Sequence, residues 1–250
     1  MHMIMEIPSW LGFGMLVILL AGFIQGVTSF GFALVSLPLL TLFLPLRQVV
    51  PLIVILSFFT NIAIFINCYK HVVIRKIGLL TLSGIVAAPL GSYLLLYVNE
   101  TALKIAAGGL IVLSSAVMMS GKTFQVTRER LGFVTVGLAS GLLNGSISMS
   151  GPPVALFLSN QGTDKGAFRG NLTFYALLLN AVTIISYIYG GLLDEAVSET
   201  LVWLIPAMIA GVLLGIWAGG KLNEAVFKKL TLILILVSGC WTLWTAIKGL

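Results

Sequence analysis

Long runs without charge dominate the chain, and two of them are too long to be single membrane spans. Residues 7–46 carry no charged side chain over 40 positions, and residues 131–163 carry none over 33. The other six uncharged runs are 17 to 24 residues long, the length of one helix across a hydrocarbon layer about 30 Å thick. We therefore expect each long run to break or fold back near its middle.

The expected elements form the same series twice. A long segment at 9–45 and another at 131–161 are each followed by three spans, which we expect at 49–69, 77–97, 103–120, 168–190, 201–220 and 230–247. The predicted fold class is an all-α polytopic membrane protein of two inverted repeats, each a broken or re-entrant helical hairpin plus three transmembrane helices. The expected divisions are a single membrane domain over 1–250, repeat 1 at 8–120, a basic linker at 121–130 and repeat 2 at 131–250.

Matched glycine and polar positions indicate an internal duplication. The pairs at an offset of 119 residues are Gly22 with Gly141, Gln25 with Asn144, Gly26 with Gly145, Ser29 with Ser148, and Asn61 with Asn180. After a change in loop length the offset becomes 124, and it pairs Gly91 with Gly215 and Lys104 with Lys228. Apolar matches arise by chance in such a chain, whereas matched glycine and polar residues at a constant offset do not.

The distribution of Lys and Arg predicts that the second repeat is inverted. If all eight segments crossed once, these residues would divide evenly, 7 to 7, between the two sides. If both long segments enter and leave on one face, the division becomes 11 to 3, with only Arg47, Lys104 and Lys248 on the poor side. The positive-inside rule favours the second arrangement, with linker 121–130 cytoplasmic and both termini outside. It leaves open whether each long segment is re-entrant or two short spans.

Composition restricts the protein to the membrane class. The chain is 59% hydrophobic and 9% charged, with a mean hydropathy of +1.11 and a net charge of +6. A soluble domain of this length cannot bury that much apolar surface. The basic residues are scattered over loops, which favours an anionic lipid surface over nucleic acid as their partner. Cys68 and Cys240 lie in apolar segments, as buried cysteines do, and indicate neither a disulfide nor a metal pair.

The middles of the two long runs are the candidate binding site. The first reads GFIQGVTSFGF at 22–32 and the second reads GLLNGSISMSGPP at 141–153. We call these two stretches the first tip and the second tip. A helix that restarts there would point free N–H groups and the positive end of its dipole at the membrane midplane, which favours an anion. Ser148 or Ser150 could cap the second restarting helix, and Pro152 suits its first turn. The candidates in these two tips are Gln25, Gly26, Thr28, Ser29, Gly31, Asn144, Gly145, Ser146, Ser148, Ser150 and Gly151.

Each candidate also has a purely structural interpretation. The glycine pairs at a spacing of four residues fit close helix–helix packing. Asn61 and Asn180, in the next span of each repeat, are either site residues or interhelical hydrogen-bond partners. Arg169, with Asn171 beyond it, either guides an anion or extends to the interface.

Acidic residues are missing from every predicted span, which excludes several functions. Intramembrane metal and aspartyl chemistry needs carboxylates or His at depth, and a serine hydrolase needs a base. We expect no enzyme, no metal and no cofactor. A buried carboxylate would repel an anion, so an interior without acids suits an anionic substrate.

The tips resemble the paired signature of the TauE/SafE family, also called the toluene-sulfonate uptake permeases. Its Gly-rich stretch stands here as Gly22, Gly26 and Gly31 and again as Gly141, Gly145 and Gly151. An A-x-x-x-N pattern at Ala167–Asn171, followed by Asn180, adds to a resemblance that covers about residues 10–247. Two features depart from the family pattern. Phe30 and Phe32 flank Gly31 in the first tip, where small residues are common, and Ser150 in the second tip stands at the position matching Gly31.

The resemblance implies a bacterial or archaeal cytoplasmic-membrane carrier that works without an ATPase and transports sulfite or a short organosulfonate. The expected partners are this small anion and the lipid bilayer, with no nucleic acid and with a homodimer left open. Two rival functions also stay open: a carrier of another organic anion or of a neutral organosulfur compound, and a membrane scaffold that transports nothing.

Overall fold

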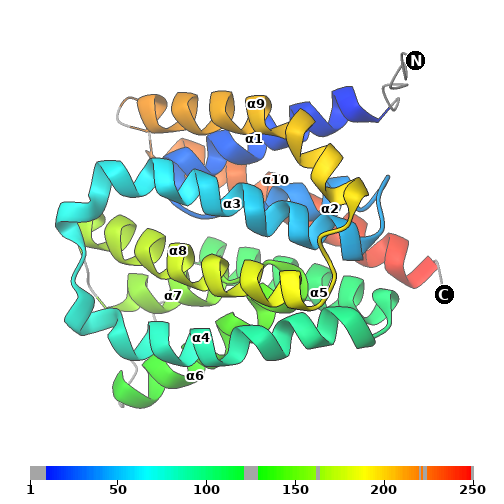
Figure 1. Ribbon diagram of the computed structural model, residues 1–250. Coiled ribbons are helices and arrows are strands. Elements are labelled where there is room, and N and C mark those ends of the chain that lie inside the picture. The colour runs from blue at the N-terminus through cyan, green and yellow to red at the C-terminus, as the bar shows by residue number, and fades with distance from the viewer. Residues whose placement is uncertain (1–9, 121–128, 162–163, 220, 222–223, 249–250) are drawn as a thin grey trace.

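A computed structural model describes residues 10–120, 129–161, 164–219, 221 and 224–248. Helices are the only regular elements in this described part of the chain (Figure 1). They are α1 (Leu11–Thr28), α2 (Phe32–Leu40), α3 (Leu46–Cys68), a 3-10 turn η1 (Tyr69–His71), α4 (Ile74–Tyr97), α5 (Glu100–Ser120), α6 (Glu129–Ile147), α7 (Gly151–Asn160), α8 (Lys165–Tyr189), α9 (Glu195–Ala218) and α10 (Glu224–Lys248). The all-α fold class is confirmed.

Both long uncharged segments break in the middle. The helix α1 ends at Thr28 and α2 starts at Phe32, whereas α6 ends at Ile147 and α7 starts at Gly151. Both first helices end on a serine in the left-handed conformation, with φ of 67° at Ser29 and 59° at Ser148. A left-handed residue, which is rare among L-residues, ends a helix and turns the chain. The chain direction therefore changes sharply at both breaks.

Several helices begin earlier than their uncharged runs indicated. The helix α9 was expected from 201 but begins at Glu195, with the Asp194 side chain accepting a hydrogen bond of 2.8 Å from the Val197 N–H. The helix α8 was expected from 168 but begins at Lys165, and Asp164 caps it through the Ala167 N–H at 2.9 Å. Acidic residues stabilise the first turn of a helix, and a count of uncharged residues leaves them out.

Glycines bring α1 against α9 and α6 against α4. An added Cβ at Gly26 would lie 2.7 Å from the Val212 carbonyl oxygen and 2.9 Å from the Gly215 carbonyl carbon. At Gly145 it would lie 2.7 Å from the Gly91 carbonyl carbon. In each pair the contacts advance in the same direction along both helices, so the two helices run parallel. Only glycine allows backbones to approach so closely.

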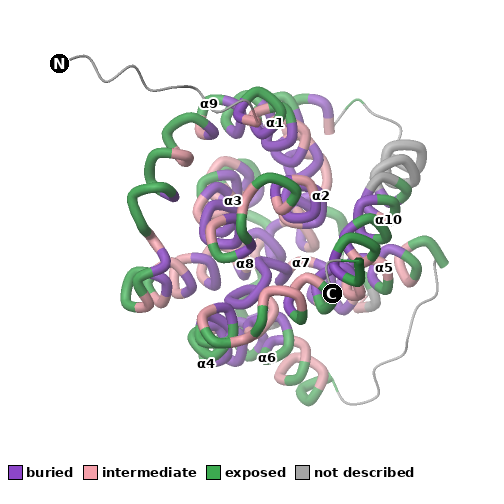
Figure 2. Tube along the Cα trace, turned by 90° about the vertical axis from the view of Figure 1, so that its right-hand side faces the viewer, coloured by how far each residue is buried: buried purple, intermediate pink, exposed green. Residues whose placement is uncertain are grey.

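The α1–α9 pair and the α4–α6 pair enclose the centre of the molecule. Figures 1 and 2 place α1 and α9 on one side and α4 and α6 on the other, with α3 and α8 between them. The helices α3 and α8 pack on each other, and α5 and α10 pair along one flank. In Figure 1, α1 and α6 run in opposite directions, and so do α3 and α8.

The outer surface is apolar, as a bilayer requires. Large exposed side chains such as Leu82, Tyr97 and Val202 are more than 60% exposed, and Figure 2 shows exposed positions turned outward around a buried centre. Six of the described helical segments have the length and apolar composition of a membrane span: 11–28, 46–71, 77–97, 100–120, 165–189 and 195–218. The protein is a multi-pass membrane protein. The expected linker at 121–130 and the two termini fall largely outside the described residues.

Candidate functional site

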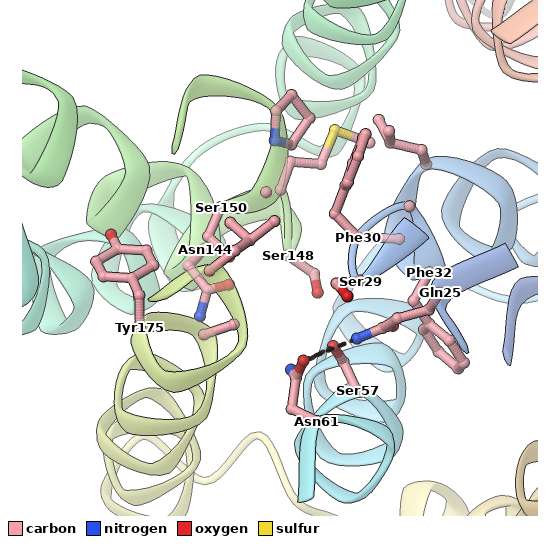
Figure 3. Close-up of a pocket in the computed structure, with 18 residues that line it drawn as sticks. Gln25, Ser29, Phe30, Phe32, Ser57, Asn61, Asn144, Ser148, Ser150 and Tyr175 are labelled. Carbon is pink, nitrogen blue, oxygen red and sulfur yellow. Dashed lines mark hydrogen bonds between the residues drawn. The ribbon is translucent and has the colours of Figure 1, made fainter. Parts of the chain in front are cut away.

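The two helix breaks meet at a cavity in the centre of the molecule. The cavity has a volume of about 40 Å³, roughly three times what one water molecule needs. Figure 3 shows the hydroxyl groups of Ser29 and Ser148 directed into the same space between the tips. The lining comprises Gln25, Ser29, Phe30, Gly31, Phe32, Ala33, Leu34, Ser57, Asn61, Asn144, Ser148, Met149, Ser150, Gly151, Pro152, Leu172, Tyr175 and Ala176. None of these side chains carries a charge.

A chain of amides and a hydroxyl fixes the first tip to α3. Gln25 Nε2 donates to Asn61 Oδ1 at 3.0 Å, and Asn61 Nδ2 donates to Ser57 Oγ at 3.4 Å (Figure 3). Gln25 and Asn61 are 3% and 0% exposed. Because such buried amides need partners, this series of hydrogen bonds holds the Gln25 side chain at the cavity wall.

The matched residues fix the second tip to α8. Asn144 Nδ2 donates to Asn180 Oδ1 at 3.0 Å and to Thr183 Oγ1 at 2.9 Å. The Tyr187 hydroxyl donates to the Gly145 carbonyl oxygen at 2.7 Å. Each tip is therefore tied to the helix that follows it, and the Gln25–Asn61 bond corresponds to the Asn144–Asn180 bond.

The first tip presents polar groups, both donors and one acceptor, that have no partner among the described residues. The N-terminus of α2 has no side-chain cap, and its first residues Phe32, Ala33 and Leu34 line the cavity. The first N–H groups of a helix have no partner within the helix. Beside them, Ser29 Oγ is buried without a hydrogen-bond partner among the described residues, and so is Gln25 Oε1. Buried polar groups left in this way indicate a ligand or water position.

The second tip presents fewer donors. No side chain caps α7, so neither Ser148 nor Ser150 has the capping role that the sequence suggested. Pro152 lies in the first turn of α7, as predicted, and Pro153 follows it. Prolines have no N–H, so α7 loses two of the donors that α2 offers. The Ser150 carbonyl accepts a hydrogen bond from Ser140 at 2.9 Å, which fastens this break to α6.

The predicted site residues fall into two groups. The cavity is lined by Gln25, Ser29, Gly31, Asn61, Asn144, Ser148, Ser150 and Gly151. Outside the lining lie Gly26, Thr28, Gly145, Ser146, Arg169, Asn171 and Asn180. Sequence gave no means of separating the groups, because both contain small or polar residues within one helical turn of each other.

The residues outside the lining make structural contacts. Gly26 and Gly145 are packing positions, as their alternative interpretation held. Thr28 donates to the Ile24 carbonyl at 2.8 Å and to the Phe30 carbonyl, and Ser146 donates to the Leu142 carbonyl at 2.8 Å. These bonds satisfy the backbone where the helices end.

Two residues of α8 that were expected at the site bind backbone instead. Asn171 accepts a hydrogen bond from the Val73 N–H at 2.8 Å, just before α4 begins. Arg169 donates to the carbonyl oxygens of Gly26 and Val27, each at 3.0 Å. Arg169 therefore binds the end of α1 and does not extend toward the interface as a snorkelling side chain would.

Several lining residues were missed by the sequence interpretation. Phe30 packs on the second tip, where an added Cβ at Gly151 would lie 3.3 Å from the Phe30 Cβ. Tyr175 contributes its ring to the cavity wall, while its hydroxyl points away from Ser148 (Figure 3). Phe30 was noted in the sequence only as a departure from the family pattern, and Tyr175 was not noted at all, because aromatic side chains are common throughout this chain.

The chain matches the family model described as "Sulfite exporter TauE/SafE" over residues 14–242. The chain belongs to the TauE/SafE family. The match spans both helix breaks and all six helices that line the cavity, α1, α2, α3, α6, α7 and α8. The family is one of membrane transporters of sulfur anions. No curated protein and no solved structure matches the chain significantly.

Proposed function

We propose that this TauE/SafE protein is a secondary transporter that carries a small sulfur-containing anion, sulfite or a short organosulfonate, across the cytoplasmic membrane of a bacterium or archaeon. One observation carries the proposal. The uncapped N-terminus of α2 opens onto the cavity beside the unpartnered Ser29 hydroxyl. An anion there would receive backbone N–H groups, the positive end of a helix dipole and a hydroxyl donor.

The polarity and size of the cavity support a small anion. No carboxylate lines it, so the wall carries no formal negative charge. Its volume of about 40 Å³ accommodates a few non-hydrogen atoms, which is the size class of sulfite. Phe30, Phe32, Met149 and Leu172 form an apolar part of the wall, against which the carbon atoms of a short sulfonate would pack. Serine and amide groups would orient the sulfur oxygens.

Inverted pseudo-symmetry supports transport by alternating access. Gly26 packs on Gly215, and the matched Gly145 packs on Gly91. The first helix of each broken hairpin thus lies on the second of the three spans of the other half, and α1 and α6 run in opposite directions (Figure 1). Two inverted halves that share one site can exchange conformations and open it to each side in turn.

The charge distribution orients the proposed transporter. The side rich in Lys and Arg, with linker 121–130, is placed in the cytoplasm, and the termini are placed outside. No catalytic role is proposed, because the cavity lining contains neither an acid nor His or Cys.

Uptake of radiolabelled sulfite into proteoliposomes tests the proposal. We expect saturable uptake that unlabelled sulfite and short sulfonates inhibit and that neutral sulfones of the same size do not. The S29A and S148A variants should lose affinity, while S36A, a buried serine of α2 outside the cavity lining, should not. Inhibition by the neutral compounds alone would contradict an anion site, and no uptake or thermal shift with any compound would support a scaffold.

A further inference from the structure

A cation from the second half of the chain binds the helix end in the first half. Arg169, near the start of α8, donates from Nη1 to the Val27 carbonyl and from Nη2 to the Gly26 carbonyl, each at 3.0 Å. These carbonyls belong to the last turn of α1, so no N–H group of the helix donates to them. The planar guanidinium group satisfies both at once, a geometry that lysine cannot reproduce.

The corresponding contact in the other half has a different chemistry. Gly145, which matches Gly26, has its carbonyl bound by the neutral Tyr187 hydroxyl at 2.7 Å. The position that matches Arg169 at the offset of 119 residues is Val50. The Arg169 contact therefore has no counterpart, and it joins the two halves, whereas Tyr187 and Gly145 both belong to the second half.

The bound helix end determines where the cavity donors lie. Gln25 precedes the two bound carbonyls and Ser29 follows them, and the Ser29 N–H donates to the Gln25 carbonyl at 2.7 Å. Both side chains line the cavity, and α8 contributes Leu172 to its wall. Arg169 thus fixes the first tip relative to the helix that forms the opposite wall. Arg169 also offsets the negative end of the α1 dipole. Without that positive charge, the dipole end would disfavour an anion bound beside it.

We propose that Arg169 is a positioning residue for anion binding, acting through its forked hydrogen bonds to Gly26 and Val27 and not through attraction of the anion by its charge. The inference rests on the proposed function of the cavity. The competing explanation is electrostatic guidance, in which any cation at this end of α8 would serve equally well.

Two substitutions separate the explanations. R169K keeps the charge but removes the paired hydrogen bonds to Gly26 and Val27. K165Q removes a charge one turn earlier on the same helix and keeps those hydrogen bonds. Positioning predicts that R169K raises the dissociation constant for sulfite about tenfold, as expected from the loss of a charge-assisted hydrogen bond, and that K165Q leaves it unchanged. A dissociation constant that is unchanged in R169K and raised in K165Q would overturn the inference, as would an R169K chain that does not fold.

Hydrogen–deuterium exchange tests the contact without any ligand. In R169K we expect faster exchange in the peptide that contains residues 26–32, with unchanged exchange at 145–151. The Y187F variant should show the reverse pattern, because it loses the bond to Gly145. Equal exchange at 26–32 in wild type and R169K would refute positioning. If wild type binds no sulfur anion, the proposed function fails, whereas the exchange result still decides whether Arg169 holds the tip.

Discussion

Ser29 and Ser148 occupy matched positions in the two halves, and both have a left-handed backbone, with φ of 67° and 59°. They are the only non-glycine residues with positive φ in the described part of the chain. Each N–H bonds to the carbonyl of the residue four positions earlier, Gln25 at 2.7 Å and Asn144 at 2.9 Å. The two breaks are therefore built in the same way, and each directs a hydroxyl into the shared cavity.

Paired substitutions at Ser148 separate its backbone role from its hydroxyl. S148A and S148G both remove the hydroxyl, so both should weaken sulfite binding. Glycine accepts the left-handed conformation and alanine does not, so S148G should be more stable than S148A by about 1 kcal/mol. Thermal unfolding in detergent and binding titrations measure the two effects. Equal stability of the variants, or full affinity in either of them, would contradict this assignment.

Adding a methyl group at a packing glycine should destabilise the fold. G26A places a Cβ 2.7 Å from the Val212 carbonyl oxygen, and such overpacking costs about 1–3 kcal/mol. G109A is the matched control because an added Cβ in the middle of α5 has no neighbour within 4 Å. Thermal unfolding should show a lower midpoint for G26A and an equal or higher one for G109A, since alanine favours helix. A G26A protein as stable as wild type would show that the helices separate easily.

A carboxylate in the cavity wall should exclude the anion. Q25E has nearly the shape of wild type but places negative charge beside the uncapped N-terminus of α2. Repulsion between this charge and the anion should weaken sulfite binding at neutral pH. N67D, on the exposed side of α3, should bind as wild type does. Binding titrations provide the test, and equal affinity of Q25E and wild type at neutral pH would argue against an anion at this wall.

The inverted arrangement predicts that matched helix starts face opposite sides of the membrane. Arg47 lies at the beginning of α3 and Lys165 at the beginning of α8, at opposite ends of the molecule in Figure 1. With Cys68 and Cys240 replaced by serine, R47C should react with an impermeant maleimide added outside cells and K165C should not. Reaction of both from the same side would contradict inversion.

Sequence patterns predicted the helical framework because its signals are local. Uncharged runs located the spans, and glycine and small polar residues placed a break within 22–32 and another within 141–153. The structure puts the breaks at Ser29 and Ser148, whereas Gly26 and Gly145 lie inside helices. Helix starts were placed too late where an acidic cap such as Asp194 precedes the apolar run. That error follows from counting charge alone, since a cap stabilises the helix that it precedes.

The cavity was predicted only in part, because its lining depends on tertiary packing. The matched residues Gln25 and Asn144 reach it, while Asn180, which binds Asn144, is absent from the lining. The role of Arg169 required the structure, since its partners Gly26 and Val27 are backbone carbonyls more than a hundred residues away. Backbone acceptors carry no signature in a side-chain pattern.

Anomalous X-ray diffraction from crystals soaked with selenite, a heavier relative of sulfite, tests the central claim most directly. The account predicts a single strong selenium peak between the two helix breaks, with its oxygens about 3 Å from the Ser29 and Ser148 hydroxyls and near the N-terminus of α2. The peak should weaken in crystals of the S29A variant. Crystals of a protein that transports selenite, with an empty cavity and a selenium peak elsewhere, would contradict the account.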